Sequence, residues 1–204
     1  MRRLLGVCTV LVVLFMSASS LVANAYQSGT YGSGTYGSCA YGIACSISLT
    51  SNGTVSLNVT PGVGGACTIQ SDTASVLTDD ANGYTLTLAD NSTNTGLVNG
   101  SYTIPATSGT FASPTALTAN TWGYRVDGAG SFGSGPTTSQ TNISPGSLTF
   151  AAIEASNQTP DVLANTSTAA DPAVTTTVWY GACANQTVTS GTYTTQVTYT
   201  ALTN

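Results

Sequence analysis

Residues 45–59 read CSISLTSNGTVSLNV, and this stretch decides the fold class. Apolar and polar residues alternate through residues 45–49 and again through residues 55–59. A period of two is typical of a β-strand with one buried and one exposed face. Ser51-Asn52-Gly53 lies between the two segments and is a turn signal, so the sequence predicts a β-hairpin here.

Similar short segments recur along the rest of the chain, each bounded by Gly, Pro, Asn or Ser. They lie at residues 67–69, 74–77, 84–88, 102–104, 121–126, 148–152, 174–180 and 192–201. No stretch has the 3.6-residue period of an amphipathic helix. About nine or ten short strands separated by turns predict an all-β, immunoglobulin-like or jelly-roll sandwich. The Gly-, Ser- and Thr-rich stretch 128–147 and the stretch 154–173, which contains Pro160 and Pro172, are predicted to be surface loops.

Residues 1–25 have the pattern of a secretory signal peptide. Arg2 and Arg3 precede the apolar run 4–16, and Ala23-Asn24-Ala25 is a small-x-small cleavage site. The run is shorter than the roughly 20 residues that cross a bilayer as a helix. We therefore expect a secreted protein, extracellular or on the cell surface, with no membrane association after cleavage. Residues 44–204 are then one sandwich domain.

Residues 26–43 form a separate segment with a five-residue repeat. SGTYG at residues 28–32 is followed by SGTYG at 33–37 and SCAYG at 38–42. Its glycines weaken a strand that stands alone, whereas Tyr and Thr favour extended backbone once another surface supplies the pairing. The segment is therefore either a flexible leader or an N-terminal extended arm that docks on a neighbouring subunit.

Four cysteines follow the predicted cleavage site, namely Cys39, Cys45, Cys67 and Cys183. An even number in an exported chain predicts two disulfides, and three pairings are open. A zinc site is the less favoured alternative because the spacing contains no C-x2-C pair.

The chain has few of the residue types that enzymes use in catalysis. Beyond residue 25 the chain has no His and no Lys, and Arg125 is its one basic residue. Enzymes do most proton transfer and covalent chemistry with His, Lys, Cys and carboxylates. Glu154 and Asp161 are interpreted as solvated acids rather than a glycosidase pair. We therefore expect no enzyme activity, no catalytic residue and no cofactor.

Charged and aromatic residues have structural interpretations. The acidic turn Asp79-Asp80-Ala81-Asn82-Gly83 predicts a turn, with calcium as a minor alternative, so no metal site is assigned. Arg125 is interpreted as forming a local ion pair with Asp127 or an interface contact. Trp122-Gly123-Tyr124 and Trp179-Tyr180 are interpreted as core rather than as a sugar-stacking platform.

After the leader the chain has eight acidic residues and one basic residue, Arg125, so its net charge is negative. A negative surface repels phosphate, which excludes nucleic acid as a partner.

Asparagine sequons of the N-x-[ST] type are frequent and make the exterior compatible with glycans. They occur at Asn52, Asn58, Asn91, Asn99, Asn142, Asn157, Asn165 and Asn185.

The C-terminal end resembles that of secreted pilin domains of the spore-coat-U type. The resemblance rests on Val178-Trp179-Tyr180-Gly181, Asn185-Gln186-Thr187-Val188, Ser190-Gly191-Thr192-Tyr193-Thr194 and Val197-Thr198-Tyr199-Thr200. Residues 83–124 are similar to Thr/Ser-rich surface proteins of small-genome bacteria and, more weakly, to WxL wall-binding domains. These resemblances imply an immunoglobulin-like exported module with a surface or fibre role.

Pilins of this kind assemble by strand donation, in which a neighbour's N-terminal strand fills an incomplete sandwich. The resemblance therefore implies a fibre subunit whose partners are copies of itself. The donor would lie between Tyr26 and Leu49, with Tyr31, Tyr36, Tyr41, Cys45, Ile47 and Leu49 as candidate residues. Residues 45–49 are alternatively the first strand of the domain's own sheet. The second functional hypothesis is a monomeric cell-surface binding module, for example for carbohydrate.

Overall fold

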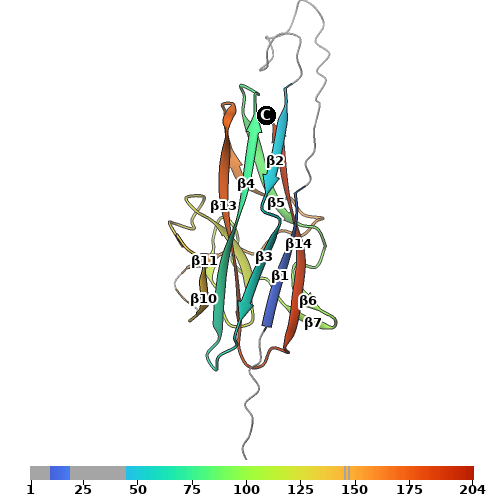
Figure 1. The fold of residues 1–204 in the computed structure, drawn as a ribbon, viewed down its shortest axis with the longest axis vertical. Helices are drawn as coiled ribbons and strands as arrows, with labels where there is room; N and C mark the ends of the chain where they lie inside the picture. Colours follow the sequence, from blue (N-terminus) through green and yellow to red (C-terminus); the bar gives the residue numbers. More distant parts are fainter. Residues whose placement is uncertain (1–9, 19–44, 145, 147) are drawn as a thin grey trace, which may run out of the picture.

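The protein is all-β. The computed structural model describes residues 10–18, 45–144, 146 and 148–204, and of residues 10–18 it describes the backbone. These residues form fourteen strands and no helix (Figure 1). The predicted all-β fold is therefore confirmed. In this part of the chain there is likewise no helix that is long and apolar enough to cross a membrane.

One layer of the sandwich, here called sheet A, has seven strands. Its main path runs β12-β5-β14-β1-β3, and β6 pairs with both β14 and β7. The bounds are β1 Val10–Ala18, β3 Thr54–Val59, β5 Tyr84–Asp90, β6 Leu97–Asn99, β7 Tyr102–Ile104, β12 Asp161–Asn165 and β14 Gly191–Thr203.

The second layer, sheet B, has five strands. Its path runs β10-β4-β13-β9, and β2 also pairs with β4. The bounds are β2 Ile47–Ser51, β4 Ala66–Thr78, β9 Trp122–Val126, β10 Gln140–Ile143 and β13 Ala170–Ala184. A separate two-stranded sheet joins β8 Thr115–Ala116 to β11 Thr149–Phe150.

The main core lies between sheets A and B. Alternate residues of β3 and β5 are buried because successive side chains point to opposite faces of a sheet. In β3 the buried residues are Val55, Leu57 and Val59, and in β5 they are Tyr84, Leu86 and Leu88. Trp122, Tyr124, Trp179 and Tyr180 are all buried, which confirms their interpretation as core residues.

The predicted hairpin at Ser51-Asn52-Gly53 is wrong, because the two strands that flank these residues belong to different sheets. β2 pairs with β4 in sheet B, whereas β3 pairs with β1 in sheet A. Gly53 has a φ of 94°, and the backbone N–H of Asn52 donates to Asp72 Oδ1 at 3.0 Å. The chain therefore crosses from one sheet to the other at this point. Both flanking strands keep their alternation because they face the same core from opposite sides.

The strand count also differs from the predicted nine or ten. The two segments expected at 67–69 and 74–77 are parts of one strand, β4. The predicted loops 128–147 and 154–173 contain β10 and β12, which each pair along one edge of a sheet. Edge strands expose much of their surface to water and are therefore rich in polar residues. Such strands lack the alternation of apolar and polar residues on which the prediction depends.

A smaller apolar cluster covers the outer face of sheet B. It consists of Cys67, Ile69, Leu117, Phe150, Trp179 and Cys183. Cys67 and Cys183 are directly opposite each other on β4 and β13 and form a disulfide. This face is therefore a second core, closed by the segments around Leu117 and Phe150.

Candidate assembly interface

Strand β1 lies in the middle of sheet A, between β14 and β3 (Figure 1). It runs parallel to β14, from Val10 opposite Gly191 to Ala18 opposite Tyr199. It runs antiparallel to β3, from Val10 opposite Val59 to Phe15 opposite Thr54. Among the described residues, β3 has no strand partner other than β1. Sheet A is therefore continuous only while β1 is in place.

The space between β14 and β3 is here called the acceptor gap. It is bounded by the backbones of residues 191–199 and 54–59. β1 falls within residues 1–25, the predicted signal peptide. Cleavage after Ala25 would remove β1 and leave the facing edges of β14 and β3 without a ladder partner. Unpaired strand edges are templates for pairing with another strand.

One face of the acceptor gap is apolar and the other is polar. Buried side chains on the core face come from both walls, namely Val55, Leu57, Val59, Tyr193, Val197 and Tyr199. On the outer face Ser56, Asn58 and Gln196 are exposed. An occupant must therefore be extended and must place side chains against the core at every second residue.

Sheet B holds β3 through contacts to the chain at both ends of the strand. Before β3, Asn52 N donates to Asp72 Oδ1. Near its end, Thr68 Oγ1 donates to the carbonyl of Asn58 at 2.6 Å, and just beyond it Thr60 N donates to Asn142 Oδ1 at 2.6 Å. These three bonds do not involve β1, so they tie the far wall of the acceptor gap independently of the occupant.

Asp72 is a buried carboxylate behind this wall. Its Oδ1 accepts from Asn52, whereas its Oδ2 has no hydrogen-bond partner in the described part of the chain. Burial raises the pKa of the Asp72 carboxyl, and the hydrogen bond from the Asn52 backbone opposes that shift. The negative form of Asp72 is thus disfavoured inside the fold.

The predicted donor residues fall into two groups and one further residue, Cys45, which lies just before β2. Tyr31, Tyr36 and Tyr41 lie outside the described residues. Ile47 and Leu49 lie in β2, are buried, and pair with β4 of their own chain. The second interpretation of residues 45–49, as the domain's own first strand, is the one that matches these contacts.

The cysteine prediction is confirmed for one bridge, Cys67–Cys183. Cys45 is also disulfide-bonded, and Cys39 lies outside the described residues. The pairing was left open by the sequence because it depends on which strands become neighbours.

Arg125 is 1% exposed, and its contacts are internal. Its Nη2 donates to the carbonyl of Phe132 at 2.8 Å, and its Nη1 donates to that of Thr149 at 3.2 Å. Its Nε lies 3.8 Å from Asp127 Oδ1, which confirms the predicted local ion pair. Burial lowers the pKa of the guanidinium, and the charge of Asp127 opposes that shift. The side chain ties the turn after β9 to the outer face of sheet B, and its interface role stays a prediction.

The acidic candidates take structural roles. The N–H of Asn82 donates to Asp80 Oδ1 and that of Gly83 to the Asp80 carbonyl, so the predicted turn is present. The described residues include no group of three or more side chains suited to hold a metal ion. Asp161 is not simply solvated as predicted, because its Oδ2 accepts from the Tyr124 hydroxyl at 2.6 Å. Burial raises the pKa of Asp161, and this hydrogen bond opposes the shift.

The sequon asparagines differ in their exposure to solvent and in their side-chain hydrogen bonds. Asn99 and Asn185 are half-buried, and the other six are exposed. Asn52, Asn91, Asn142 and Asn165 use their side chains in hydrogen bonds to Thr73, Gln196, Thr60 and Asn204. Asn58 and Asn157 are exposed and make no side-chain hydrogen bond within the described residues. These two are the sequons most open to modification.

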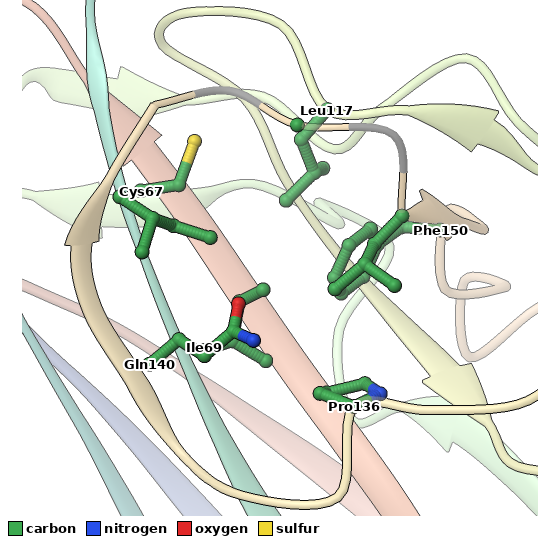
Figure 2. A pocket seen from close by; sticks show the side chains of 9 residues that line it. Cys67, Ile69, Leu117, Pro136, Gln140 and Phe150 are labelled. Carbon is green, nitrogen blue, oxygen red and sulfur yellow. The ribbon is translucent and has the colours of Figure 1, made fainter.

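A pocket of about 240 Å³ lies on the outer face of sheet B. Figure 2 shows it between the strands of the sheet and the segment that carries Pro136 and Gln140. Its lining is mostly apolar and includes Ile69, Leu117 and Phe150. This composition suits a small apolar group better than a sugar ring, which needs several hydrogen-bonding partners.

No protein-family model and no curated protein matches this chain.

Proposed function

We propose that the protein is the structural subunit of an extracellular filament or pilus-like fibre. In this proposal the N-terminal segment of one subunit fills the acceptor gap of the next, and the subunits assemble head to tail. The single observation that carries the proposal is the pairing of β3, whose one strand partner in the described chain is β1. Because β1 belongs to the predicted signal peptide, the processed chain needs a replacement strand.

The energetic need for a replacement is substantial. Val55, Leu57 and Val59 are each less than 5% exposed when β1 is present. Burying one such side chain contributes roughly 1.5–3 kcal/mol. A whole domain is stable by only about 5–15 kcal/mol. An open gap therefore exposes enough apolar surface to decide whether the sandwich is stable, and a strand from another subunit restores it.

The arm at residues 26–43 is the proposed donor. It directly follows the predicted cleavage site and carries Tyr31, Tyr36 and Tyr41 within a Gly- and Thr-rich repeat. β2 is already paired with β4, so the proposal gives the donor role to the arm, which precedes β2 in the processed chain. Backbone hydrogen bonds give such a contact its affinity, and alternate side chains give it register.

The proposal is tested with the chain 26–204, refolded under oxidising conditions and imaged by negative-stain microscopy. We expect fibres. Deleting residues 26–42 together with Cys45→Ser removes the donor but keeps the acceptor gap, so this variant should form no fibres and should cap those of the intact chain. A stable, dispersed monomer of 26–204 at high concentration would contradict the proposal.

A matched pair of substitutions tests the acceptor side. Leu57→Asp places a charge on the core face of the gap, whereas Ser56→Asp places it on the exposed face of the same strand. Fibre growth should stop with Leu57→Asp and continue with Ser56→Asp. A synthetic peptide of residues 10–18 added to the unaltered 26–204 chain provides a second measurement that needs no substitution. It should inhibit growth by filling the gap.

The pocket on sheet B favours a second candidate, a cell-surface binding module with a small apolar ligand. The sugar-stacking version has less support because Trp122 and Trp179 are buried. Ligand binding by a 26–204 chain that stays monomeric would favour this candidate over the fibre.

A further inference from the structure

We propose that the leader segment Val10–Ala18 is an intramolecular plug. In the uncleaved precursor it occupies the acceptor gap of its own chain and blocks assembly, and cleavage after Ala25 opens the gap. The block on assembly, which is the consequence of the plug, rests on the proposed function. Its structural basis, the occupancy of the gap by β1, is independent of that function.

The fit of the segment to the gap is extensive. All nine residues of β1 are in register with β14, and six of them are also in register with β3. A strand in the middle of a sheet has both edges paired, which avoids the unpaired backbone groups of an edge strand. The segment VLVVLFMSA is rich in β-branched and aliphatic residues, which favour a central strand.

The register also matches the apolar face of the gap. Val12 lies opposite Tyr193 and Leu57, Leu14 opposite Val55, and Met16 opposite Val197. Each of these partners on β14 and β3 is buried on the core side. Residues 10–16 of the leader are all apolar, so apolar residues stand opposite these buried partners in the register.

The covalent tether gives the plug an advantage over a donor from another subunit. Residues 19–44 connect β1 to the domain, and a segment of this length can span at most roughly 90 Å. A tethered segment competes at an effective concentration on the order of millimolar. A donor arm on a separate chain competes at its own bulk concentration, which is micromolar in a typical preparation. While the tether is intact, the leader should therefore exclude the foreign donor.

Cleavage between Ala25 and Tyr26 removes this advantage in one step. It separates the plug from the domain and at the same time makes Tyr26 the new N-terminus of the arm. The released segment then competes only at bulk concentration. One proteolytic event therefore converts a closed precursor into a subunit that can accept a strand and donate one.

The occupancy is tested by disulfide trapping in the full chain with Cys8→Ser. Val13 and Ser56 are Cα partners across β1 and β3, whereas Asn58 is two residues out of register with Val13. The variant V13C/S56C should form an intramolecular cross-link on mild oxidation, and the matched control V13C/N58C should form it at least tenfold more slowly. Equal rates for the two pairs would overturn the inference.

The block is tested with a site-specific protease sequence inserted between Ala25 and Tyr26. Before cutting, the full chain should be monomeric in light scattering. After cutting it should form fibres, and the trapped V13C/S56C chain should remain monomeric. A precursor that assembles as fast as the cut chain would overturn the plug while leaving the fibre function intact. A cut chain that stays monomeric, although the matched pair cross-links, would overturn the fibre function and with it the block.

Discussion

The hydroxyl oxygens of Tyr180 and Tyr199 lie 2.8 Å apart and form a hydrogen bond across the buried core. Tyr180 belongs to β13 of sheet B, and Tyr199 belongs to β14 of sheet A. Burial raises the pKa of both hydroxyls, so both stay protonated at ordinary pH. Because Tyr199 also lies opposite Ala18 of β1, this bond ties one wall of the acceptor gap to the other sheet.

Replacing Tyr199 with Phe removes one member of this pair. We expect the free energy of unfolding of the full chain to fall by about 1–3 kcal/mol, because the Tyr180 hydroxyl loses its partner inside the core. Denaturant titration measures the loss. The double variant Tyr180→Phe/Tyr199→Phe should lose less than the sum of the single variants. Additive losses would show that the two hydroxyls are not coupled.

Gly181 of β13 lies under the loop cluster on the outer face of sheet B. A Cβ at this position would lie 2.8 Å from both Leu117 Cδ1 and a ring carbon of Phe150. Gly181→Ala should therefore cost about 1–3 kcal/mol through overpacking. Gly64→Ala is the matched control, since a Cβ there meets no atom within 4 Å. Similar thermal midpoints for the two variants would contradict the packing seen around Phe150.

The Cys67–Cys183 bridge joins residues 116 positions apart. A bridge over so long a loop removes much entropy from the unfolded chain and contributes about 4–5 kcal/mol on the chain-entropy account. The double variant Cys67→Ala/Cys183→Ala should lose about this amount, together with the packing of two buried sulfurs. Calorimetry of the full chain checks the loss. An unchanged midpoint would contradict this account of the bridge.

The buried carboxyl of Asp72 makes stability depend on pH. Its pKa in the fold is raised above the ordinary value of 3.8, mainly by burial. The folded state therefore binds the proton more tightly than the unfolded state, and this contribution is fully present below pH 3.8. It is lost as pH rises through the raised pKa, so stability should decrease from acid toward neutral pH. Asp90 and Asp161 have raised pKa values through burial and act in the same direction.

Asp72→Asn should reduce this slope and raise the free energy of unfolding at pH 7, because an amide oxygen still accepts from Asn52. Denaturant midpoints between pH 3.5 and pH 7 measure both effects. The exposed Asp171→Asn is a control for loss of one charge and should change stability by less than about 0.5 kcal/mol. A steeper slope in Asp72→Asn would contradict the burial argument.

The alternation of apolar and polar residues along the sequence was sufficient to predict part of the fold. It located β3, β5 and much of β14 because their inward residues are apolar and their outward residues are Thr, Ser or Asn. It missed the short strands β6 and β8 and the edge strands β10 and β12, and it joined β2 to β3 as a hairpin. The error arose because a turn signal reports a local bend and does not report which sheet each flanking strand enters.

The incomplete sandwich that the resemblance to pilin domains implies stays a prediction, since β1 lies between β14 and β3 in the described sheet. Composition and spacing did not say which strands would border an opening. The leader was assigned from its charge, its apolar run and its cleavage site. Nothing in those local features indicated that residues 10–18 pair with both β14 and β3.

The sequence by itself determined the all-β class, the want of the usual catalytic bases and the cysteines available for bridging, because these follow from composition and from a two-residue period. Only the tertiary structure decided that Cys67 faces Cys183, that β2 and β3 belong to different sheets, and that β3 depends on a strand from the predicted leader. Strand pairing joins residues far apart in the chain through backbone groups that every sequence shares. Such partners are selected by the packing of the whole core, which no local pattern contains.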